Sequence, residues 1–333
     1  MNFMQYTITQ DDENRRIDRV LRKFLKKELT LSQIYKYLRN GQIKVNNKKT
    51  KPDYKTQKND IIFINEYLIQ NKNSKNESEN QNKKSINIPK LEVIFENQFV
   101  KIINKPYNIS VQKSKKEEIS LDDIIKQDYK PTEKSLSFLP GPLHRLDKKT
   151  TGLLAFSNNL VGAQEFSKIL QNHEITKTYI AILEGNLKSP ERWIDKISIN
   201  EIKKQGDFKT VSVSEKTSET NPDSKEAITE VFPIKTGIFQ NKEITLAKIL
   251  IYTGRTHQIR SQCAFHGFPL LGDTAYNPKT SKISKNFDFF LHAYKLNIPK
   301  NNKISIPEEI IAPLPKNFLI FLKKYLSLED FPL

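Results

Sequence analysis

The stretch PGPLHRLDKKTTGLLAFSNN, residues 140–159, combines a turn, a polar cluster and an apolar run. A Pro-Gly-Pro turn leads into His144, Arg145 and Asp147, and the run Leu153–Phe156 is apolar enough to predict a buried strand. A polar cluster on a turn that a core strand anchors is how a rigid scaffold holds a reactive group. A carboxylate such as Asp147 can serve there as a nucleophile or a general base, although an Arg–Asp pair can also simply stabilise a turn.

A second polar cluster follows a predicted strand in IYTGRTHQIRSQCAFHGFPLLGDTAYN, residues 251–277. It brings together four side chains: Arg255, His257, Gln258 and Arg260. We predict a helix after Thr256, so a phosphate can meet both the helix N-terminus and the arginines. A single arginine here would indicate a phosphate or surface contact, but four such residues together disfavour a wholly structural role.

A third segment, ITKTYIAILEG at residues 175–185, alternates Lys177 and Tyr179 with apolar residues and predicts a strand. An aromatic residue in a strand usually packs in the core. Next to a carboxylate site, however, Tyr179 can also stack on a base, which contributes roughly 1–3 kcal/mol per base. Both interpretations stay open from the residues alone.

The remaining periodicity predicts the fold class. Strand-like runs occupy residues 91–95, 99–104, 228–231 and 245–252, and helical runs occupy residues 121–125 and 163–170. Because strands and helices do not alternate strictly, we expect an α+β fold with a mixed, mostly antiparallel central sheet and flanking helices. Residues 203–225 are polar and predict a long surface excursion.

Positive charge concentrates near the N-terminus. Between Arg15 and Lys51 there are thirteen basic residues, opposed only by Asp18 and Glu28. Apolar residues at helical spacing predict helices over 17–25 and 31–38, the second begun by Thr30 and ended by Gly41, and short strands over 43–45 and 61–64. The cations expected to bind RNA or DNA are Arg16, Arg19, Lys36 and Arg39. The plain alternative is an ordinary solvated helix face.

Composition sets the wider limits. The 333 residues fit two domains, and a net charge of +17 favours a polyanionic partner. Residues 70–85 contain no apolar side chain and predict a flexible linker between a basic module, 1–69, and a catalytic domain, 86–333. The single cysteine excludes a disulfide framework, and no apolar run is long enough for a membrane span. We therefore expect a cytoplasmic protein without a membrane partner.

Five ordered segments resemble the RluA-type family of RNA pseudouridine synthases. They lie at residues 144–154 (HRLDKKTTGLL), 177–179 (KTY), 253–260 (TGRTHQIR), 267–276 (GFPLLGDTAY) and 290–296 (FLHAYKL). The basic module resembles the RNA-binding domain of a small-subunit ribosomal protein, which many synthases of this family carry. The whole chain is similar to bacterial synthases that modify 23S ribosomal RNA of the large subunit.

The resemblance implies that the chain isomerises uridine in RNA without a cofactor. It implies that Asp147 is catalytic, that Arg260 (with Arg255 in reserve) pairs with it, and that Tyr179 stacks on the flipped base. Arg145 suits the distorted RNA strand, and His144 suits backbone binding or bracing of the loop. The resemblance also places Lys177, His257 and Gln258 at the substrate.

Two other functions compete with this interpretation. A metal-dependent hydrolase could use the five histidines, but no pair has a metal-binding spacing such as HExxH. A non-catalytic RNA-binding or ribosome-assembly protein is the second, and the joint presence of Asp147, Tyr179 and Arg260 argues against it. The expected partner is ribosomal RNA, with transfer RNA as the alternative substrate, and we expect a monomer.

Overall fold

The computed structural model describes residues 2–329 except 27, 70–88, 114–117, 132, 200–210, 216–223, 281–282 and 284–286. The chain forms two compact units. The N-terminal unit comprises residues 1–90, 124–141 and 158–161, and the sheet unit comprises residues 91–123, 142–157 and 162–333. The predicted linker at 70–85 lies outside the described residues.

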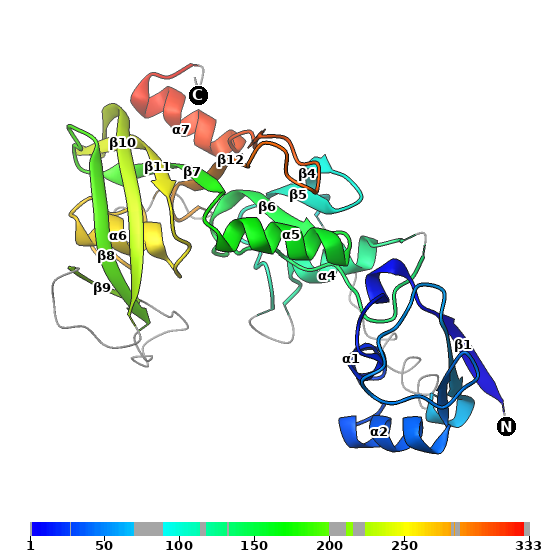
Figure 1. The fold of residues 1–333 in the computed structure, drawn as a ribbon. Helices are drawn as coiled ribbons and strands as arrows, with labels where there is room; N and C mark the ends of the chain where they lie inside the picture. Colours follow the sequence, from blue (N-terminus) through cyan, green and yellow to red (C-terminus); the bar gives the residue numbers. More distant parts are fainter. Residues whose placement is uncertain are drawn as a thin grey trace. The chain divides into compact units, whose positions relative to one another are not determined.

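The N-terminal unit contains a small antiparallel sheet and two helices (Figure 1). Its elements are β1 (Phe3–Thr7), η1 (Gln10–Asp12), α1 (Ile17–Phe24), α2 (Leu31–Asn40), β2 (Ile43–Val45), β3 (Ile61–Asn65) and η2 (Glu66–Leu68), with strand order β1-β3-β2. The predicted ends of α2 are confirmed: Thr30 forms a capping box with Gln33, and Gly41 ends the helix with φ +74°. The strand β1 was not predicted from the sequence.

Both helices bury one face and expose the other. Val20, Leu21, Ile34 and Leu38 are fully buried together with Ile62 and other apolar residues of the small sheet. Each such side chain contributes roughly 1.5–3 kcal/mol to folding. Because the apolar positions of α1 and α2 face this core, the intervening cations point to solvent.

Residues 135–137 join the N-terminal unit through a buried carboxylate. The Asp12 side chain is fully buried and accepts hydrogen bonds from Ser135 Oγ (2.8 Å), from the backbone N–H of Leu136 (2.9 Å) and from that of Ser137 (3.0 Å). A buried carboxylate is tolerated only when donors surround it, so this loop completes the unit. The sequence had placed these residues with the catalytic domain.

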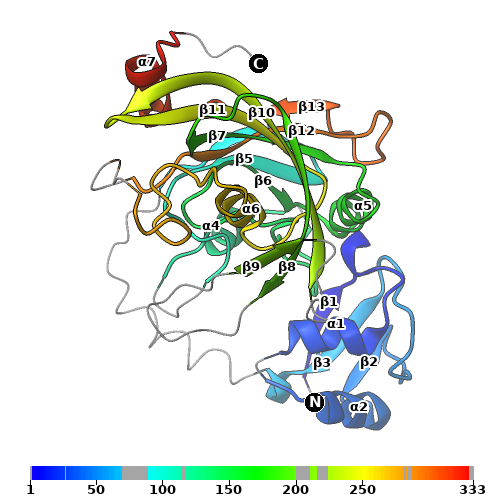
Figure 2. The same ribbon diagram turned by 90° about the vertical axis from the view of Figure 1, so that its left-hand side faces the viewer.

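The sheet unit contains a ten-stranded sheet (Figures 1 and 2). The sheet is mixed and mostly antiparallel, which confirms the predicted fold class. Its strands are β4 (Glu92–Glu96), β5 (Val100–Lys105), β6 (Thr151–Ser157), β7 (Thr176–Glu184), β8 (Glu191–Ile199), β9 (Val211–Glu215), β10 (Lys225–Phe239), β11 (Lys242–Ile251), β12 (Leu291–Asn297) and β13 (Glu309–Ile311). The order is β4-β5-β6-β12-β7-β11-β10-β8-β9, and β13 pairs with β12. Among the described strands, only the pair β6 and β12 is parallel. The remaining helices are α4 (Leu121–Asp128), α5 (Leu160–Gln171), α6 (Gln258–Phe265) and α7 (Lys316–Leu326).

The middle of the expected surface excursion is a strand instead. Val211–Glu215 pairs antiparallel with β8 at the end of the sheet, while most of residues 203–225 lies outside the described part of the chain. The sequence VSVS alternates apolar and polar residues, which is the pattern of a half-buried strand. The polar residues on both sides concealed this short signal.

The two faces of β7 have different roles. Ile180 and Ile182 pack into a core with Phe290 and Phe318, the latter from α7. Because side chains alternate along a strand, Lys177 and Tyr179 project from the opposite face. The central strand therefore carries core residues on one side and candidate site residues on the other.

Close approach of β6 and β12 requires glycine. Gly152 pairs with Ala293 and has φ +105°, and a Cβ atom there would collide with the Ala293 carbonyl oxygen. No other residue fits against that backbone. The strand that follows Asp147 is thereby held against the late strand β12.

Candidate active site

Asp147 lies in a loop whose ends are both fixed. The backbone N–H of Leu143 donates to the Ala155 carbonyl (2.8 Å), and the N–H of Thr150 donates to the Asp147 carbonyl (3.1 Å). The Ala155 N–H donates to His144 Nε2 (3.1 Å). Burial, and then the neighbouring positive charge of Lys177, lower the pKa of His144 to about 3. His144 is therefore a neutral imidazole that braces the loop, one of the two roles the resemblance implied.

Lys105 fixes the other side of this loop. Its ammonium group is buried and donates to three backbone carbonyl oxygens, those of Pro106 (3.0 Å), Lys148 (2.8 Å) and Thr150 (2.7 Å). Burial lowers the pKa of Lys105 to about 7, while the Asp147 carboxylate acts in the opposite direction. Only the ammonium form has three N–H donors, so these contacts require the charged lysine.

Arg260 connects Asp147 to a second carboxylate. Its Nη1 lies 3.1 Å from Asp147 Oδ2, and its Nε and Nη2 lie 2.7 and 2.9 Å from the two oxygens of Asp273. The Asp147 side chain is 26% exposed, that of Arg260 9% and that of Asp273 2%. Burial acts to lower the pKa of Arg260, but the bonds to Asp273 and Asp147 outweigh it and raise the value. Arg260 therefore stays charged, and it is the expected partner of Asp147.

Two aromatic rings complete the surroundings of the guanidinium. The Arg260 Cζ atom lies 5.1 Å from the ring centre of Tyr276 and 4.8 Å from that of Phe289. A cation held over aromatic faces is stabilised further where water is excluded. The rings and Asp273 together hold the guanidinium in the orientation in which its third nitrogen, Nη1, faces Asp147.

His257 is the N-cap residue of α6, with φ +53°, and its two ring nitrogens face Tyr276 and Asp147. The Tyr276 hydroxyl accepts from the Val211 N–H (3.2 Å) and lies 2.9 Å from His257 Nδ1. Burial is the largest influence and lowers the pKa of His257, so the ring is neutral at pH 7. The simplest arrangement has Tyr276 donating to Nδ1, which leaves the proton on Nε2, 3.8 Å from Asp147 Oδ1. That N–H faces the carboxylate without bonding it and can donate to a substrate.

Tyr179 and Lys177 lie on β7, where Tyr179 is near the Asp147 carboxylate and Lys177 is near His144. Tyr179 is 7% exposed, and burial, with the nearby charge of Asp147, raises the pKa of its hydroxyl. The phenol therefore stays protonated at neutral pH. Burial lowers the pKa of Lys177 to about 8, and its Nζ lies 3.9 Å from where a Cβ of Gly254 would be.

The other predicted site residues separate into two groups. Arg145 is exposed, and its side chain makes no hydrogen bond or ion pair with any described residue, so it is available to RNA. Gln258 is buried, and its amide bonds Ile228 O, Thr229 Oγ1, the Arg255 N–H and the Thr253 hydroxyl. Its hydrogen-bonding capacity is therefore spent on bracing the turn before α6 rather than on RNA. Arg255 Nε donates to the Glu226 carbonyl (2.9 Å), and Arg255 does not pair with Asp147.

The N-terminal cations also differ among themselves. Arg19, Lys36 and Arg39 are exposed and form no ion pair within the described part of the chain. Arg16 instead pairs with Asp18 at 2.8 Å. Three of the four predicted RNA-binding cations are therefore free, and Arg16 has a structural partner.

Sequence reasoning gave no role to Lys105, Asp273 or Phe289. Asp273 stood within the matched segment 267–276, and Lys105 lay just after the predicted strand 99–104. The signal that could have indicated Lys105 is a lysine that ends the apolar run VKIINK. Across the described residues, no three His, Cys, Asp or Glu side chains are grouped to hold a metal ion. No helix in the described part is long and apolar enough to cross a bilayer.

Comparisons with known proteins show which families this chain is similar to. A family model described as RNA pseudouridylate synthase matches residues 100–265, and an S4 domain model matches residues 15–62. The ribosomal large subunit pseudouridine synthase C of Buchnera aphidicola subsp. Baizongia pistaciae is 30% identical over 324 residues, covering 95% of each chain. The protein of that name in Haemophilus ducreyi is 29% identical over 332 residues, covering 97% of this chain and 96% of the relative.

A solved structure shares the fold. Human RNA Pseudouridylate Synthase Domain Containing 1 superposes with a TM-score of 0.54 at 22% identity, covering 70% of this chain and 86% of the human one. The resemblance seen in the five sequence segments, and that of the basic module to a ribosomal RNA-binding domain, are thereby confirmed.

Proposed function

The chain belongs to the RNA pseudouridylate synthase family, and we propose that it isomerises uridine in large-subunit ribosomal RNA with Asp147 as the reacting carboxylate. The observation that supports this role is the placement of Asp147. It is the partly exposed end of a buried Asp273–Arg260 pair, so its charge is stabilised while one face stays open to substrate. Its neighbours are a neutral tyrosine and a neutral histidine.

The reaction rearranges the uridine and adds no atom from the protein to the product. The bond between N1 of uracil and C1′ of ribose breaks, the base turns, and C5 bonds to C1′. The proton on C5 leaves and N1 ends protonated, so atoms and electrons balance without a co-reactant. Asp147 either attacks C1′ or removes a proton from the sugar, and both routes need it ionised. The Arg260 guanidinium stabilises that ionised form.

The other residues act as fixed donors and surfaces. Tyr179 offers a ring on which the base stacks and a protonated hydroxyl. His257 Nε2–H points to the same carboxylate and can bond the base or the sugar as they move. Arrangements of this kind lower the barrier because the donors are oriented before the reaction begins.

The target base must leave its stack before it can reach Asp147, at a cost of a few kcal/mol. Arg145 is exposed and free, and its guanidinium can stack in the gap or bind the distorted backbone. The N-terminal unit supplies cations that hold the RNA. We expect ribosomal RNA as substrate, with transfer RNA as the alternative, and a monomer acting in the cytoplasm.

The test is to map pseudouridine in total RNA from cells with and without the gene, by carbodiimide-dependent primer-extension stops. We expect stops in large-subunit ribosomal RNA that vanish with the gene and return when the purified protein is added. Loss of stops only in transfer RNA would show that transfer RNA is the substrate and would still support the proposed isomerisation. An unchanged map, with no stops gained on adding protein, would refute the activity.

A further inference from the structure

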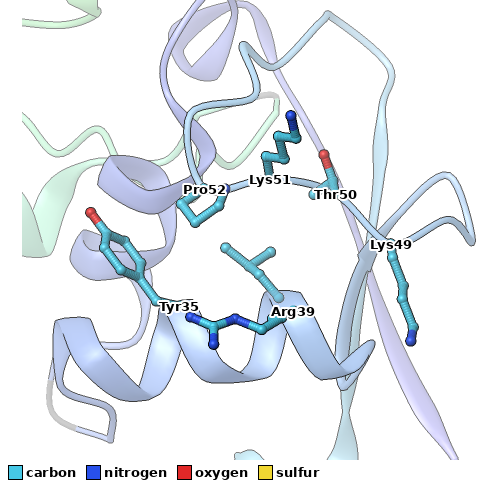
Figure 3. Close-up of a pocket in the computed structure, with 7 residues that line it drawn as sticks. Tyr35, Arg39, Lys49, Thr50, Lys51 and Pro52 are labelled. Carbon is cyan, nitrogen blue, oxygen red and sulfur yellow. The ribbon is translucent and has the colours of Figure 1, made fainter.

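We propose that a pocket on the N-terminal unit binds one unstacked nucleotide of single-stranded or bulged RNA, apart from the uridine that is isomerised. The proposal rests on the RNA substrate proposed above and gives that RNA a second point of recognition. The pocket has a volume of about 350 Å³ and lies between α2 and residues 49–52 (Figure 3). Its walls include Tyr35, Leu38, Arg39, Lys49, Lys51 and Pro52.

The size and lining suit a nucleotide. Small-molecule sites commonly enclose 300–1,000 Å³, so this pocket matches the smallest of them and holds one base with its sugar. The fully buried Leu38 lies beneath the pocket, and Tyr35 and Pro52 supply flat apolar walls. None of the lining residues is acidic. An aromatic ring beside several cations fits a base attached to phosphates better than it fits a protein segment.

Tyr35 is held in place as a stacking surface. Its hydroxyl donates to Asp18 Oδ2 at 2.9 Å, and Asp18 is 4% exposed and also pairs with Arg16. The Asp18 N–H in turn donates to the Pro52 carbonyl at 3.2 Å. One buried carboxylate residue therefore fixes both walls, so little ordering entropy is lost when a base enters.

The cations surround the pocket without partners of their own. The side chains of Arg39, Lys49 and Lys51 form no ion pair or hydrogen bond with any described residue. In Figure 3 the Arg39 side chain runs along α2 toward Tyr35, whereas the ammonium ends of Lys49 and Lys51 point in opposite directions away from it. This spread suits one phosphate at the pocket and neighbouring phosphates on either side of it.

The chemistry distinguishes single-stranded from paired RNA. In a duplex the base faces are stacked on one another, so a ring such as Tyr35 cannot reach them. A single strand exposes these faces and gains roughly 1–3 kcal/mol per stacked base. Cations alone would bind both forms through phosphates, so the aromatic wall is the feature that discriminates between them.

The experiment compares variants of the full chain in binding two labelled RNAs by fluorescence anisotropy. The probes are a uridine oligonucleotide of about ten nucleotides, within usual single-strand site sizes, and a blunt duplex of about sixteen base pairs. We expect Tyr35→Ala to weaken oligonucleotide binding about 5–150-fold and to leave duplex binding within about twofold. Tyr37→Ala is the matched control, because Tyr37 lies on the same helix and does not line the pocket.

Two further variants, with Lys58→Gln as their control, decide the result if Tyr35→Ala is unstable. Tyr35→Phe keeps the ring and should retain oligonucleotide binding within about threefold. Arg39→Gln should lower the slope of log affinity against log salt for the oligonucleotide by about 0.7, whereas Lys58→Gln, outside the pocket, should not change the preference for the single strand. Equal losses for both RNAs, or no greater loss for Tyr35→Ala than for Tyr37→Ala, would overturn the pocket.

Turnover separates this proposal from the proposed function. At saturating RNA, Tyr35→Ala should isomerise uridine at the wild-type rate, because the pocket does not touch the reacting base. A raised KM with unchanged kcat supports the pocket. A wild-type chain that binds the oligonucleotide through Tyr35 but forms no pseudouridine would contradict the activity and leave the pocket standing.

Discussion

The N-terminal unit and the surroundings of Asp147 differ in whether their charged side chains are exposed and whether they are paired. In the N-terminal unit, Arg19, Lys36 and Arg39 are exposed and unpaired within the described residues. Around Asp147, Arg260 and Asp273 are nearly buried and bonded to each other. Exposed cations act over several ångströms and are screened by salt, whereas a buried pair is rigid and nearly insensitive to salt. Many screened charges suit the capture of RNA, and a few fixed ones suit chemistry.

The largest effect should come from the one carboxylate that is left partly open. Asp147→Asn keeps the size of the side chain and removes its charge. We expect pseudouridine formation to fall by at least about a thousandfold, because neither attack nor proton removal is possible for an amide. RNA affinity should stay within a few fold. Substantial turnover by the purified variant in a carbodiimide primer-extension assay would contradict the assignment of Asp147 as the reacting carboxylate.

Breaking the buried pair should cost stability as well as activity. Asp273→Asn leaves Arg260 buried with Asp147 as its only carboxylate, and we expect the free energy of unfolding of the sheet unit to fall by about 3–5 kcal/mol. The matched control is Glu309→Gln, which breaks the exposed pair with Lys295 and should cost less than about 1 kcal/mol. Urea unfolding followed by circular dichroism measures the free energy of unfolding of both variants. Equal losses would show that the buried pair stabilises the protein no more than the exposed pair does.

Removing exposed cations should alter binding and leave the chemical step unchanged. We expect the triple variant Arg19→Gln, Arg22→Gln and Lys36→Gln to lower the slope of log affinity against log salt by up to about 0.9 for each phosphate that is no longer neutralised. Its kcat at saturating RNA should equal that of the wild type. Titrations at several salt concentrations test this, and an unchanged slope would show that these cations do not bind RNA.

The smallest effect is a pH dependence of stability. His292 is fully buried; Thr151 Oγ1 lies 2.8 Å from its Nδ1, and its Nε2 lies 3.2 Å from the Ala312 carbonyl. Burial lowers the pKa of His292 to about 4, below the value of 6.5 expected when unfolded. The unfolded chain therefore binds more protons between those values, so stability is complete above pH 6.5 and is lost as the pH falls toward 4.

Each such histidine adds a slope of up to about 1.4 kcal/mol per pH unit. Urea unfolding at a series of pH values between 6.5 and 5 should show the decline, and His292→Gln should make it shallower. His266 is the control position, since it bonds Asp195 at 2.9 Å at a partly exposed site. A decline that His292→Gln does not alter would remove His292 as its cause.

The sequence predicted those structural features that depend on residues close together in the chain. The ends of α2 depend on Thr30 and Gly41, which lie next to the helix, and the strand β2 has the predicted bounds. The alternation of Lys177 and Tyr179 with apolar residues likewise placed them on one face of a strand. The mixed sheet followed from the spread of strands along the chain, although β1, β8, β9 and β13 were not predicted.

Contacts between distant parts of the chain could not be predicted in this way. Lys105 bonds the carbonyls of residues 148 and 150, and Arg260 lies 113 positions after Asp147. Only the family resemblance joined Arg260 to Asp147, and it carried no statement about Lys105. The bonds of Gln258 in α6 could not be predicted for the same reason, since its partners Ile228 and Thr229 lie on the strand β10.

The parallel pairing of β6 with β12 joins distant parts of the chain, and this separation has a consequence for how the protein is made. Asp147 and Gly152 leave the ribosome well before Arg260, Asp273 and Ala293. At 5–20 residues per second, the chain grows for roughly 6–23 s between Asp147 and its guanidinium partner. The N-terminal unit's helices and small sheet are synthesised earliest of all. A nascent chain can therefore attach to RNA before it is able to modify it.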